Sequence, residues 1–540
     1  MSKQKAALPI KVLPHFCVKI LVMKTNLNMK EFITKAAGYQ VILPLELSVL
    51  IPKDDSVRML SAVMEREEIL RLAISAGRRE KRRRIPALIL LKVLVYGYMN
   101  KLYSSRGIES ACRRDINFMW LLAGYPAPDH NTLARFRKSV DIEAVFIEVV
   151  KLLHKADEVA FENVFIDGTK FEANANRYTF VWKGSVEKHN ARLLGKKEAF
   201  LEEFNRHYGV KFCSLSGVLD YLDYAEFVHG KGKRKSREQR DYETASELYE
   251  KEQKYLLYFE QFEGRKSFSK TDKGATFMRL KDDHMRNGQL KPAYNIQLAV
   301  ESEYIVEALV SSERGDQLTF IPMLDKISGS YNRRHKNVSA DAGYESEENY
   351  TYLKKHGHTS YIKPQNYEQR KKRAYALQIG RKENMTHDEA ADIYTCTSGK
   401  RLNHIYDTKR KSQSGYVSTV AIYQCEDCSG CERRALCTQA QVGKNKQLQV
   451  SRLFEQYRQE SLANIITEFG TQLRVNRSIQ AEGAFGVLKE DYEFRRFLMR
   501  GKKNVTVEIY LLCLAYNLNK LHKNIQNGRL KFRLHELKKE

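Results

Sequence analysis

The sequence predicts an α/β protein of several domains, in which a mixed sheet follows an all-helical N-terminal region. Between residues 163 and 363, short apolar or alternating runs typical of strands are separated by stretches of helical periodicity. Before them, from 57 to 158, the apolar spacing is helical throughout. The chain has 540 residues and is too long for one ordinary core, because domains usually hold about 100–200 residues.

The charge of the chain indicates a polyanionic partner. Lysine and arginine number 92 against 66 acidic residues, which gives a formal net charge of +26. Nucleic acid is the first candidate for such a partner, although ribosomal and cationic secreted proteins share this trait. The hydrophobic content of 42% and aromatic content of 10% are normal for a folded protein, so the charge belongs to folded domains.

Cysteine usage and apolar segments indicate a cytoplasmic protein with no membrane partner. Nine cysteines are too few for a disulfide scaffold, and a reducing compartment fits them. The apolar stretch at 11–23 is interrupted by Pro14, His15 and Lys19, and we interpret it as no export signal. The run at 85–99 is shorter than the roughly 20 residues that span a bilayer, and predicts a buried helix.

The N-terminal part divides into an extension, 1–56, and a helical domain, 57–158. We expect helices at 57–84, which ends in a basic run from Arg78 to Arg84, and then at 86–100, 104–115, 116–124 and 133–154. Short helices in close succession, flanked by Arg135 and Arg137, are typical of a helix-turn-helix DNA-binding module. A plain helical bundle explains the same periodicity equally well.

Five segments predict the strands of the sheet: 163–174 (NVFIDGTKFEAN), 292–301 (PAYNIQLAVE), 304–310 (YIVEALV), 336–341 (KNVSAD) and 358–363 (HTSYIK). A helical, charged insertion at about 185–280 interrupts them. Within it, the basic stretch 229–240 fits a solvated linker better than a DNA-contacting loop. A helix near 317–328 follows, and Asp316 is a favoured residue type for its N-cap. Trp182 fits ordinary packing better than stacking on an unpaired base.

Three carboxylates are candidates for metal-dependent chemistry. Asp167 and Asp341 each stand at the end of a predicted strand, before the small residues Gly168 and Ala342. Neighbouring strands would let the two carboxylates share a divalent ion, and magnesium prefers such hard oxygen ligands. Glu482 lies on a predicted helix with an apolar stripe, although a surface glutamate explains it as well.

The order of these three acids, with strands between them, resembles the insertion-sequence DDE transposases. The matching segments are 166–180 (IDGTKFEANANRYTF), 337–350 (NVSADAGYESEENY) and 476–489 (NRSIQAEGAFGVLK). In the last one, Lys489 follows Glu482 at the seven-residue spacing typical of that family. The similarity covers about 40–525. It implies a ribonuclease-H-like catalytic domain over 159–364 and 451–526. A break in the sheet pattern, rich in Lys, Arg, Tyr and Cys, predicts a Cys-rich insertion at 365–450, and a basic tail is expected at 527–540.

The resemblance implies sequence-specific binding of the element's ends, metal-dependent hydrolysis, and attack of the freed 3′-hydroxyl on target DNA. Asp167, Asp341 and Glu482 would be catalytic and hold two Mg²⁺ or Mn²⁺ ions, and Lys489 would contact a DNA phosphate. A homodimer on DNA and a nucleoid-associated prokaryotic protein are expected.

One motif of the family differs here. Relatives place Tyr and Arg seven and four residues before the glutamate, where this chain has Val475 and Ser478. Arg477 is the nearby candidate for the phosphate contact. Two alternatives to a transposase remain open: a DNA-binding protein without catalysis, such as a decayed or domesticated transposase, and a non-transposing nuclease of the same fold.

The Cys-rich insertion predicts a local metal site. Five cysteines lie close together in the sequence, and zinc takes four thiolates in structural sites: Cys396, Cys425, Cys428, Cys431 and Cys437. Their spacing favours zinc, but it also fits cysteines without a metal and, less well, an iron–sulfur cluster.

Overall fold

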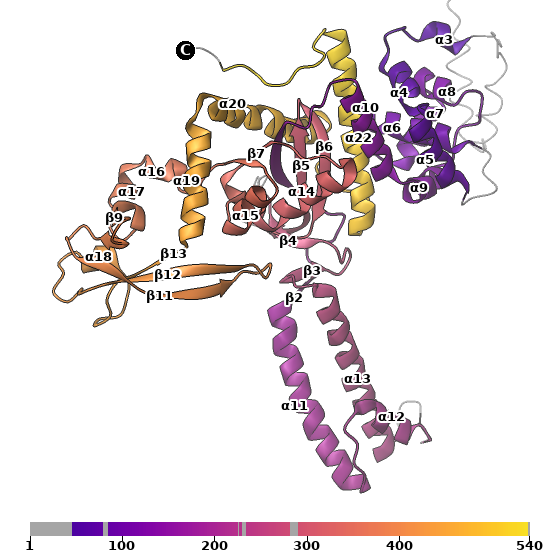
Figure 1. Cartoon of the computed structure of the whole chain (residues 1–540). Helices are drawn as coiled ribbons and strands as arrows, with labels where there is room; N and C mark the ends of the chain where they lie inside the picture. Colours follow the sequence, from indigo (N-terminus) through magenta and orange to yellow (C-terminus); the bar gives the residue numbers. More distant parts are fainter. Residues whose placement is uncertain (1–45, 79–84, 225, 229–233, 281–289, 538–540) are drawn as a thin grey trace, which may run out of the picture. The chain divides into compact units, whose positions relative to one another are not determined.

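The computed structural model describes residues 46–78, 85–224, 226–228, 234–280 and 290–537 (Figure 1). The chain divides into two compact units, Met1–Pro52 and Lys53–Glu540. In the first unit, the described residues contain the short helix α3 (Leu47–Leu50). Most of the extension 1–56, the basic run at 79–84 and part of the basic stretch 229–240 lie outside the described residues.

Helices precede the sheet in the second unit. They are α4 (Ser56–Met64), α5 (Glu67–Arg78), α6 (Ala87–Met99), α7 (Ser105–Cys112), α8 (Ile116–Leu121), α9 (His130–Ser139) and α10 (Ile142–Lys155). The apolar run identified in the sequence forms α6, and every side chain from Ile89 to Met99 is buried. This burial confirms the interpretation of the run as a packed helix.

Two of the expected helices are each split in two. The helix expected at 57–84 is interrupted between α4 and α5, and the helix expected at 133–154 is interrupted between α9 and α10. At the second break the Asp141 carboxylate accepts a hydrogen bond from the Ala144 N–H at 3.0 Å and begins α10. Aspartate is favoured at this N-cap position. Asp141 therefore begins a new helix, although the amphipathic pattern around it predicted one continuous helix.

The central sheet contains six strands: β1 (Asn163–Glu172), β4 (Thr276–Arg279), β5 (Leu290–Glu301), β6 (Tyr304–Ser311), β7 (Asn337–Ala340) and β8 (Thr359–Ile362). Their order is β4-β5-β1-β7-β8, and β6 also pairs with β5. The strand β5 is antiparallel to its partners, whereas β7 is parallel to β1 and β8. The prediction of a mixed α/β sheet is therefore confirmed.

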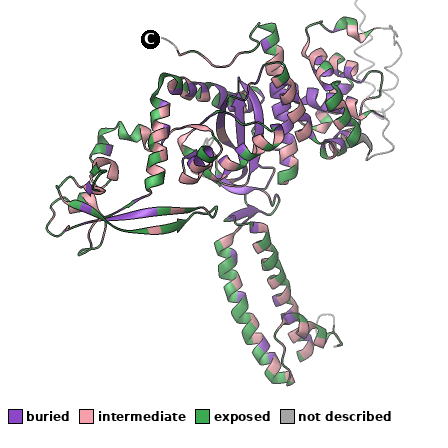
Figure 2. Ribbon diagram, viewed as in Figure 1, coloured by how far each residue is buried: buried purple, intermediate pink, exposed green. Residues whose placement is uncertain are grey.

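Helices cover this sheet, which lies in the buried interior (Figure 2). They are α14 (Gln317–Tyr331), η1 (Ala342–Tyr344), α15 (Glu347–Lys355), α19 (Arg452–Ile466), α20 (Glu468–Arg477), η3 (Ser478–Glu482), α21 (Gly483–Gly486), η4 (Val487–Asp491) and α22 (Lys502–Gln526). The apolar helix α22 packs on β6 and also on α6 and α10, so it joins the sheet to the N-terminal helices.

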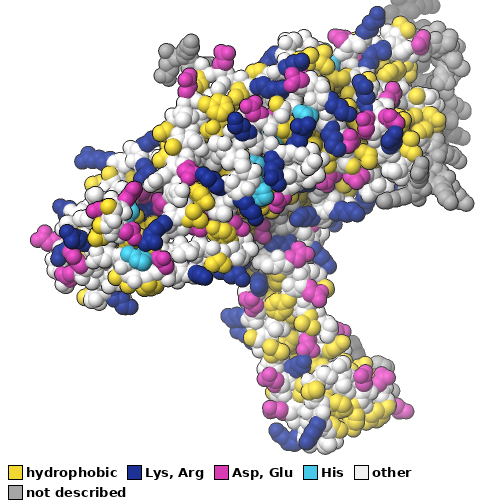
Figure 3. Space-filling view, viewed as in Figure 1, with side chains coloured by type: hydrophobic (Ala, Val, Ile, Leu, Met, Phe, Trp, Pro, Cys, Tyr) yellow, Lys and Arg dark blue, Asp and Glu magenta, His cyan; other side chains and the backbone are white. Residues whose placement is uncertain are grey.

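A helical hairpin interrupts the sheet. Its helices are α11 (Lys183–Tyr208), α12 (Leu215–Leu222) and α13 (Arg237–Phe262), and β2 (Phe180–Trp182) pairs antiparallel with β3 (Ser267–Ser269) at its base. The helices α11 and α13 run side by side and share a small apolar core of their own. Apolar side chains are also exposed on the hairpin, including Leu256 and Leu257 (Figure 3).

The Cys-rich segment, which the sequence indicated only as a break in the sheet pattern, contains a second sheet. Its elements are α16 (Tyr367–Arg370), α17 (Arg373–Ala376), η2 (Lys382–Asn384), β9 (Thr386–Asp388), β10 (Ile393–Thr395), β11 (Arg401–Lys411), β12 (Val417–Cys425), α18 (Arg434–Cys437) and β13 (Gln447–Val450). The strand order is β13-β12-β11-β10-β9. The turn between β11 and β12 contacts α15, where the Tyr416 hydroxyl donates to Glu347 at 2.9 Å.

Candidate active site

The pairing of β1 with β7 brings two of the candidate acids together. In this parallel pair Ile166 lies opposite Ala340, and each is followed by an aspartate, Asp167 and Asp341. The two carboxylates therefore start from adjacent positions of neighbouring strands. Asp341 does follow the end of its strand, but β1 continues past Asp167 to Glu172 because its pairing with β5 extends that far.

Asp167 lies at the edge of the core. The three residues before it, Val164, Phe165 and Ile166, are fully buried, and the Asp167 side chain is 15% exposed. Burial raises the pKa of Asp167 to about 6, because a charged carboxylate loses hydration there. A nearby guanidinium and the Gly168 N–H lower this pKa, whereas the charges of Asp341 and Glu482 raise it further.

Asp341 caps the short helix η1. Its carboxylate accepts a hydrogen bond from the Gly343 N–H at 2.8 Å. Gly343 also allows a close approach, since a Cβ there would lie 3.0 Å from the same carboxylate oxygen and 3.5 Å from Asp316. The backbone thus fixes one oxygen of Asp341.

Glu482 reaches the same edge of the sheet from the C-terminal helices. The helix α20 packs on β1, β7 and β8, and the following η3 packs on β1 and β5. The apolar stripe predicted from the sequence is buried: Ala481, Ala484, Phe485 and Leu488. The Glu482 side chain itself is 51% exposed, so the helix presents it at the margin of the core.

Arg477 connects the acids. One guanidinium nitrogen lies 2.7 Å from Glu482 Oε1 and another lies 3.9 Å from Asp167 Oδ1. The Ser478 hydroxyl donates to the second oxygen of Glu482 at 3.1 Å. A single arginine therefore lies between Asp167 and Glu482, and Asp341 lies near Asp167 through the pairing of β1 with β7. In the described residues, the ligand oxygens of the three acids do not all lie within 4.8 Å of one another, so a shared ion would draw them closer.

The winding of the helix accounts for the position of Arg477. Residues 478–482 form a π-helical turn, in which hydrogen bonds join residues five apart rather than four. In an ordinary α-helix, the residue four before Glu482 would share its face. In this π-helical turn, Arg477, which is five residues before Glu482, takes that place. A second π-helical segment, η4, contains Lys489, so the predicted helix forms, but with π-helical turns on both sides of α21.

A buried polar network beneath the acids was not expected from the sequence. Gln297, on β5 beside Gly168, is fully buried, and its amide nitrogen donates to Asp316 at 3.0 Å. Its amide oxygen accepts from the hydroxyl of the buried Tyr344. A Cβ on Gly168 would lie 2.2 Å from Gln297, so this glycine leaves the space that the amide occupies. The sequence around Gln297 does not indicate this network, because its partners come from distant segments of the chain.

The expectation that Asp316 caps α14 is wrong. Asp316 stands at the N-cap position, but its side chain makes no capping hydrogen bond. Its carboxylate accepts instead from Asn295 at 2.8 Å and from Gln297. These side-chain amides compete successfully for the carboxylate because they are themselves buried and require an acceptor.

The remaining candidate DNA contacts lie in different environments. Arg135 on α9 is exposed. Arg137, also expected to contact DNA, is 5% exposed and donates to the Tyr103 carbonyl at 3.0 Å, so its guanidinium belongs to the core. The Lys489 ammonium lies 5.4 Å from the centre of the Phe171 ring. Trp182 packs against Phe277 and lies under a guanidinium.

Another acidic group lies in the helical region. Glu109, Asp129 and His130 bring their ligand atoms within 4.8 Å of one another, as ligands of a metal ion do. Hydrogen bonds already engage them, since Glu109 accepts from the His130 N–H at 3.0 Å and Asp129 caps α9. The geometry alone assigns no metal here. In the part of the chain that the structure describes, no helix combines the length and apolarity needed to cross a membrane.

Comparisons with known protein families match two separate parts of the chain. A protein family described as a transposase DDE domain matches residues 395–522, and a family described as a transposase domain (DUF772) matches residues 45–139. The first match includes Glu482 and Arg477, whereas Asp167 and Asp341 lie outside both matches. No curated protein matches the chain.

Proposed function

We propose that this chain, which the two matches indicate to be an insertion-sequence DDE transposase, hydrolyses DNA at the ends of its element and joins the freed 3′-hydroxyl to target DNA. The observation that carries the proposal is the group formed by Asp167, Asp341, Glu482 and Arg477. Acids separated by more than a hundred residues converge on one edge of the sheet, beside a cation that can attract a phosphate.

The central sheet supports the ribonuclease-H-like core that the resemblance implies. The strands that carry the two aspartates are adjacent, parallel and central in the sheet, with antiparallel strands on one side. Rigid strands are suited to hold two metal ligands at a fixed separation. The helical hairpin and the Cys-rich segment then enter as two insertions into this core.

The acids fit a divalent metal. DDE transposases use divalent ions, and hard carboxylate oxygens are the ligands that Mg²⁺ and Mn²⁺ prefer. Asp341 and Glu482 add negative charge near Asp167, and Arg477 is the cation that the structure places beside Asp167 and Glu482. We assign the metal ligands to Asp167, Asp341 and Glu482. When bound, two such ions lower the pKa of the attacking hydroxyl and stabilise the charge that develops on the phosphate.

The surrounding residues prepare the site in three ways. The Gly343 N–H and the Ser478 hydroxyl each hold one carboxylate oxygen in place. Asp167 loses its proton near pH 6, so at neutral pH it is available as a ligand. Arg477 is the group that would bind the DNA phosphate, because its planar guanidinium donates several hydrogen bonds in one plane.

DNA is the proposed partner of both the N-terminal helices and the catalytic site. The exposed Arg135 on α9 and the net charge of +26 favour binding through the helical region. On the face shown in Figure 3, Lys and Arg side chains are mixed with acidic ones rather than gathered in a single block. Because two element ends are cut and joined together, we propose a homodimer on DNA.

The test is cleavage and strand transfer on a DNA duplex that carries the element's end, with Mg²⁺ or Mn²⁺. We expect Asp167→Ala, Asp341→Ala and Glu482→Ala each to reduce the rate at least a thousandfold while the protein still binds the duplex. Glu490→Ala is the matched control, since Glu490 lies on the same helical stretch, pairs with Arg495 and is exposed.

Two outcomes would contradict the proposal. The carboxylates are not catalytic if the three variants cut as fast as Glu490→Ala does. The protein is a nuclease rather than a transposase if it cuts the duplex with these acids but never joins the cut end to a second DNA.

A further inference from the structure

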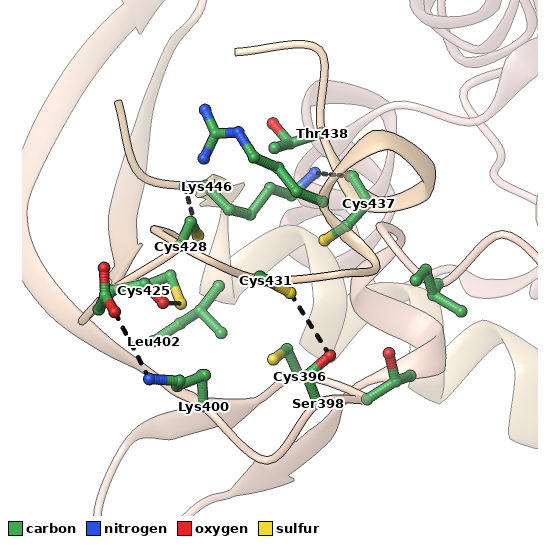
Figure 4. A pocket seen from close by; sticks show the side chains of 14 residues that line it. Cys396, Ser398, Lys400, Leu402, Cys425, Cys428, Cys431, Cys437, Thr438 and Lys446 are labelled. Atoms are coloured by element: carbon green, nitrogen blue, oxygen red, sulfur yellow. Dashed lines mark hydrogen bonds and ion pairs between the residues drawn. The ribbon is translucent and has the colours of Figure 1, made fainter. Parts of the chain in front are cut away.

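The five cysteines of the Cys-rich segment surround one small pocket (Figure 4). They come from the β10–β11 turn, the end of β12, the following loop and α18. The cavity between them measures about 20 Å³. A cavity of this size holds a single ion or water molecule and is too small for an organic ligand.

The cysteines are free thiols, although they lie close together. Cys425 and Cys428 are buried, at 3% and 8% exposed, and the other three are partly buried. Cytoplasmic proteins seldom gather thiols in this way without a metal or a redox role. No three of the sulfur atoms lie within 4.8 Å of one another in the described residues, so a bound ion would draw them inward by side-chain rotation.

Four of the five cysteines are placed to act as ligands. Cys396 lies in a turn completed by Gly399, and Cys428 and Cys431 flank Gly430; both glycines have positive φ values, 76° and 67°. Cys437 ends α18, on the other side of the pocket. Sulfurs that approach one point from separate turns are typical of structural zinc sites.

Cys425 differs from these four. It belongs to the strand β12, where it pairs opposite Leu402, whereas the other four lie in turns, loops or the short α18. Packing in the apolar core of the second sheet does not distinguish it, because Cys428 belongs to the same cluster. The Cys425 thiol donates to the Asp427 carbonyl at a sulfur–oxygen distance of 3.6 Å. A thiol that already has an acceptor and is held by a strand is the least suited of the five to rotate towards an ion.

Hydrogen-bond donors and one lysine lie beside the sulfurs. The Lys446 N–H donates to Cys428 Sγ at 3.3 Å, and the Ser398 hydroxyl lies 3.7 Å from Cys431 Sγ. The Lys446 ammonium reaches the carbonyl of Cys437 at 3.1 Å, so a positive charge borders the pocket. Hydrogen-bond donors and cations stabilise the charged sulfurs that zinc requires.

We propose that Cys396, Cys428, Cys431 and Cys437 bind one structural Zn²⁺ ion. The ion would fix the base of the β11–β12 ribbon, whose far end contacts α15. This site is separate from the carboxylates and has no part in cutting DNA. A metal ion here would also stabilise the ribbon, because β11 is exposed along most of its length and buries little apolar surface of its own.

The test measures metal in the purified full-length protein. We expect one zinc and no iron per chain by elemental analysis, and release of that zinc by a mercurial thiol reagent. Cobalt substitution should give the visible absorption bands of a tetrahedral thiolate site. An Asp167→Ala, Asp341→Ala protein should contain the same zinc, which separates this proposal from the catalytic one.

Single substitutions identify the ligands. Cys396→Ser, Cys428→Ser, Cys431→Ser and Cys437→Ser should each lower the zinc content below a third of the normal value. Cys425→Ser and the exposed control Cys213→Ser should retain it. Circular dichroism checks that each variant is folded.

Three results would overturn the assignment. Protein that carries no metal even after incubation with Zn²⁺ excludes the site. Iron with inorganic sulfide identifies a cluster instead. Loss of zinc in Cys425→Ser, with retention in one of the four other variants, shows that the wrong ligand set was chosen.

Discussion

Replacing Asp167 by asparagine should stabilise the metal-free protein while abolishing its activity. Asparagine has nearly the same shape and carries no charge. The carboxylate it replaces is largely buried, and two further carboxylates lie near it. Active-site charges of this kind commonly reduce stability, because they are arranged for a ligand and not for the empty fold.

The size of the effect follows from the pKa of Asp167, which is raised from 3.8 to about 6. A raised pKa means that the folded protein holds the proton more tightly than the unfolded chain does. Deprotonation therefore costs stability progressively as the pH rises from about 4 to 6, and the full cost is present above pH 6. At about 1.4 kcal/mol per pKa unit, the cost is about 1.5 kcal/mol at pH 5 and about 3 kcal/mol at pH 7.5.

The assay compares urea unfolding of wild type and Asp167→Asn at pH 5 and pH 7.5, in a chelating buffer. The variant should be more stable at both values, and its advantage should about double at the higher pH. Adding Mg²⁺ should then stabilise the wild type alone, since the ion binds only the folded site. A variant that is less stable at pH 7.5, or an advantage that does not change with pH, would refute the electrostatic reasoning.

Two further predictions use matched pairs of residues. Gly168→Ala should reduce DNA cleavage at least tenfold because its methyl group would lie 2.2 Å from Gln297, whereas Gly184→Ala, with open space around it, should leave the cleavage rate unchanged. Arg135→Ala should weaken DNA binding in gel-shift titrations and reduce the salt dependence by about one ion, with an unchanged melting temperature. Arg137→Ala should instead lower the stability by about 3 kcal/mol, measured by unfolding, because the Tyr103 carbonyl loses its donor and the missing side chain leaves a cavity. Equal effects within either pair would contradict the assigned environments.

The strands of the central sheet could be predicted because their burial follows a simple pattern. The apolar run before Asp167 reflects its burial, and the alternation at 292–301 indicated a strand with one buried face. The structure confirms both strands, but all residues at 292–301 are buried, including the polar Asn295 and Gln297. The strand β11 escaped prediction because nearly all of its side chains are exposed. A strand without a buried face leaves no periodic signal.

The candidate site was predictable to a different degree for each residue. Asp167 and Asp341 follow buried strands and precede small residues, so local sequence marks them. Arg477 stands one place away from the expected position because the π-helical turn inserts a residue, and sequence spacing alone does not reveal such a turn. Gln297 acts only through its neighbours in space, which come from other segments of the chain.

The segment expected as a basic tail has a more specific place. After α22 it returns to the helix that carries Glu482: Asn476 donates to the His535 carbonyl at 2.9 Å, and Gln480 donates to the Arg533 carbonyl at 3.1 Å. During synthesis these residues leave the ribosome long after the helical region and β1. If the N-terminal helices bind element ends as proposed, a product terminated early would occupy those ends without cutting them. Such fragments would compete with the intact enzyme and limit how often the element moves.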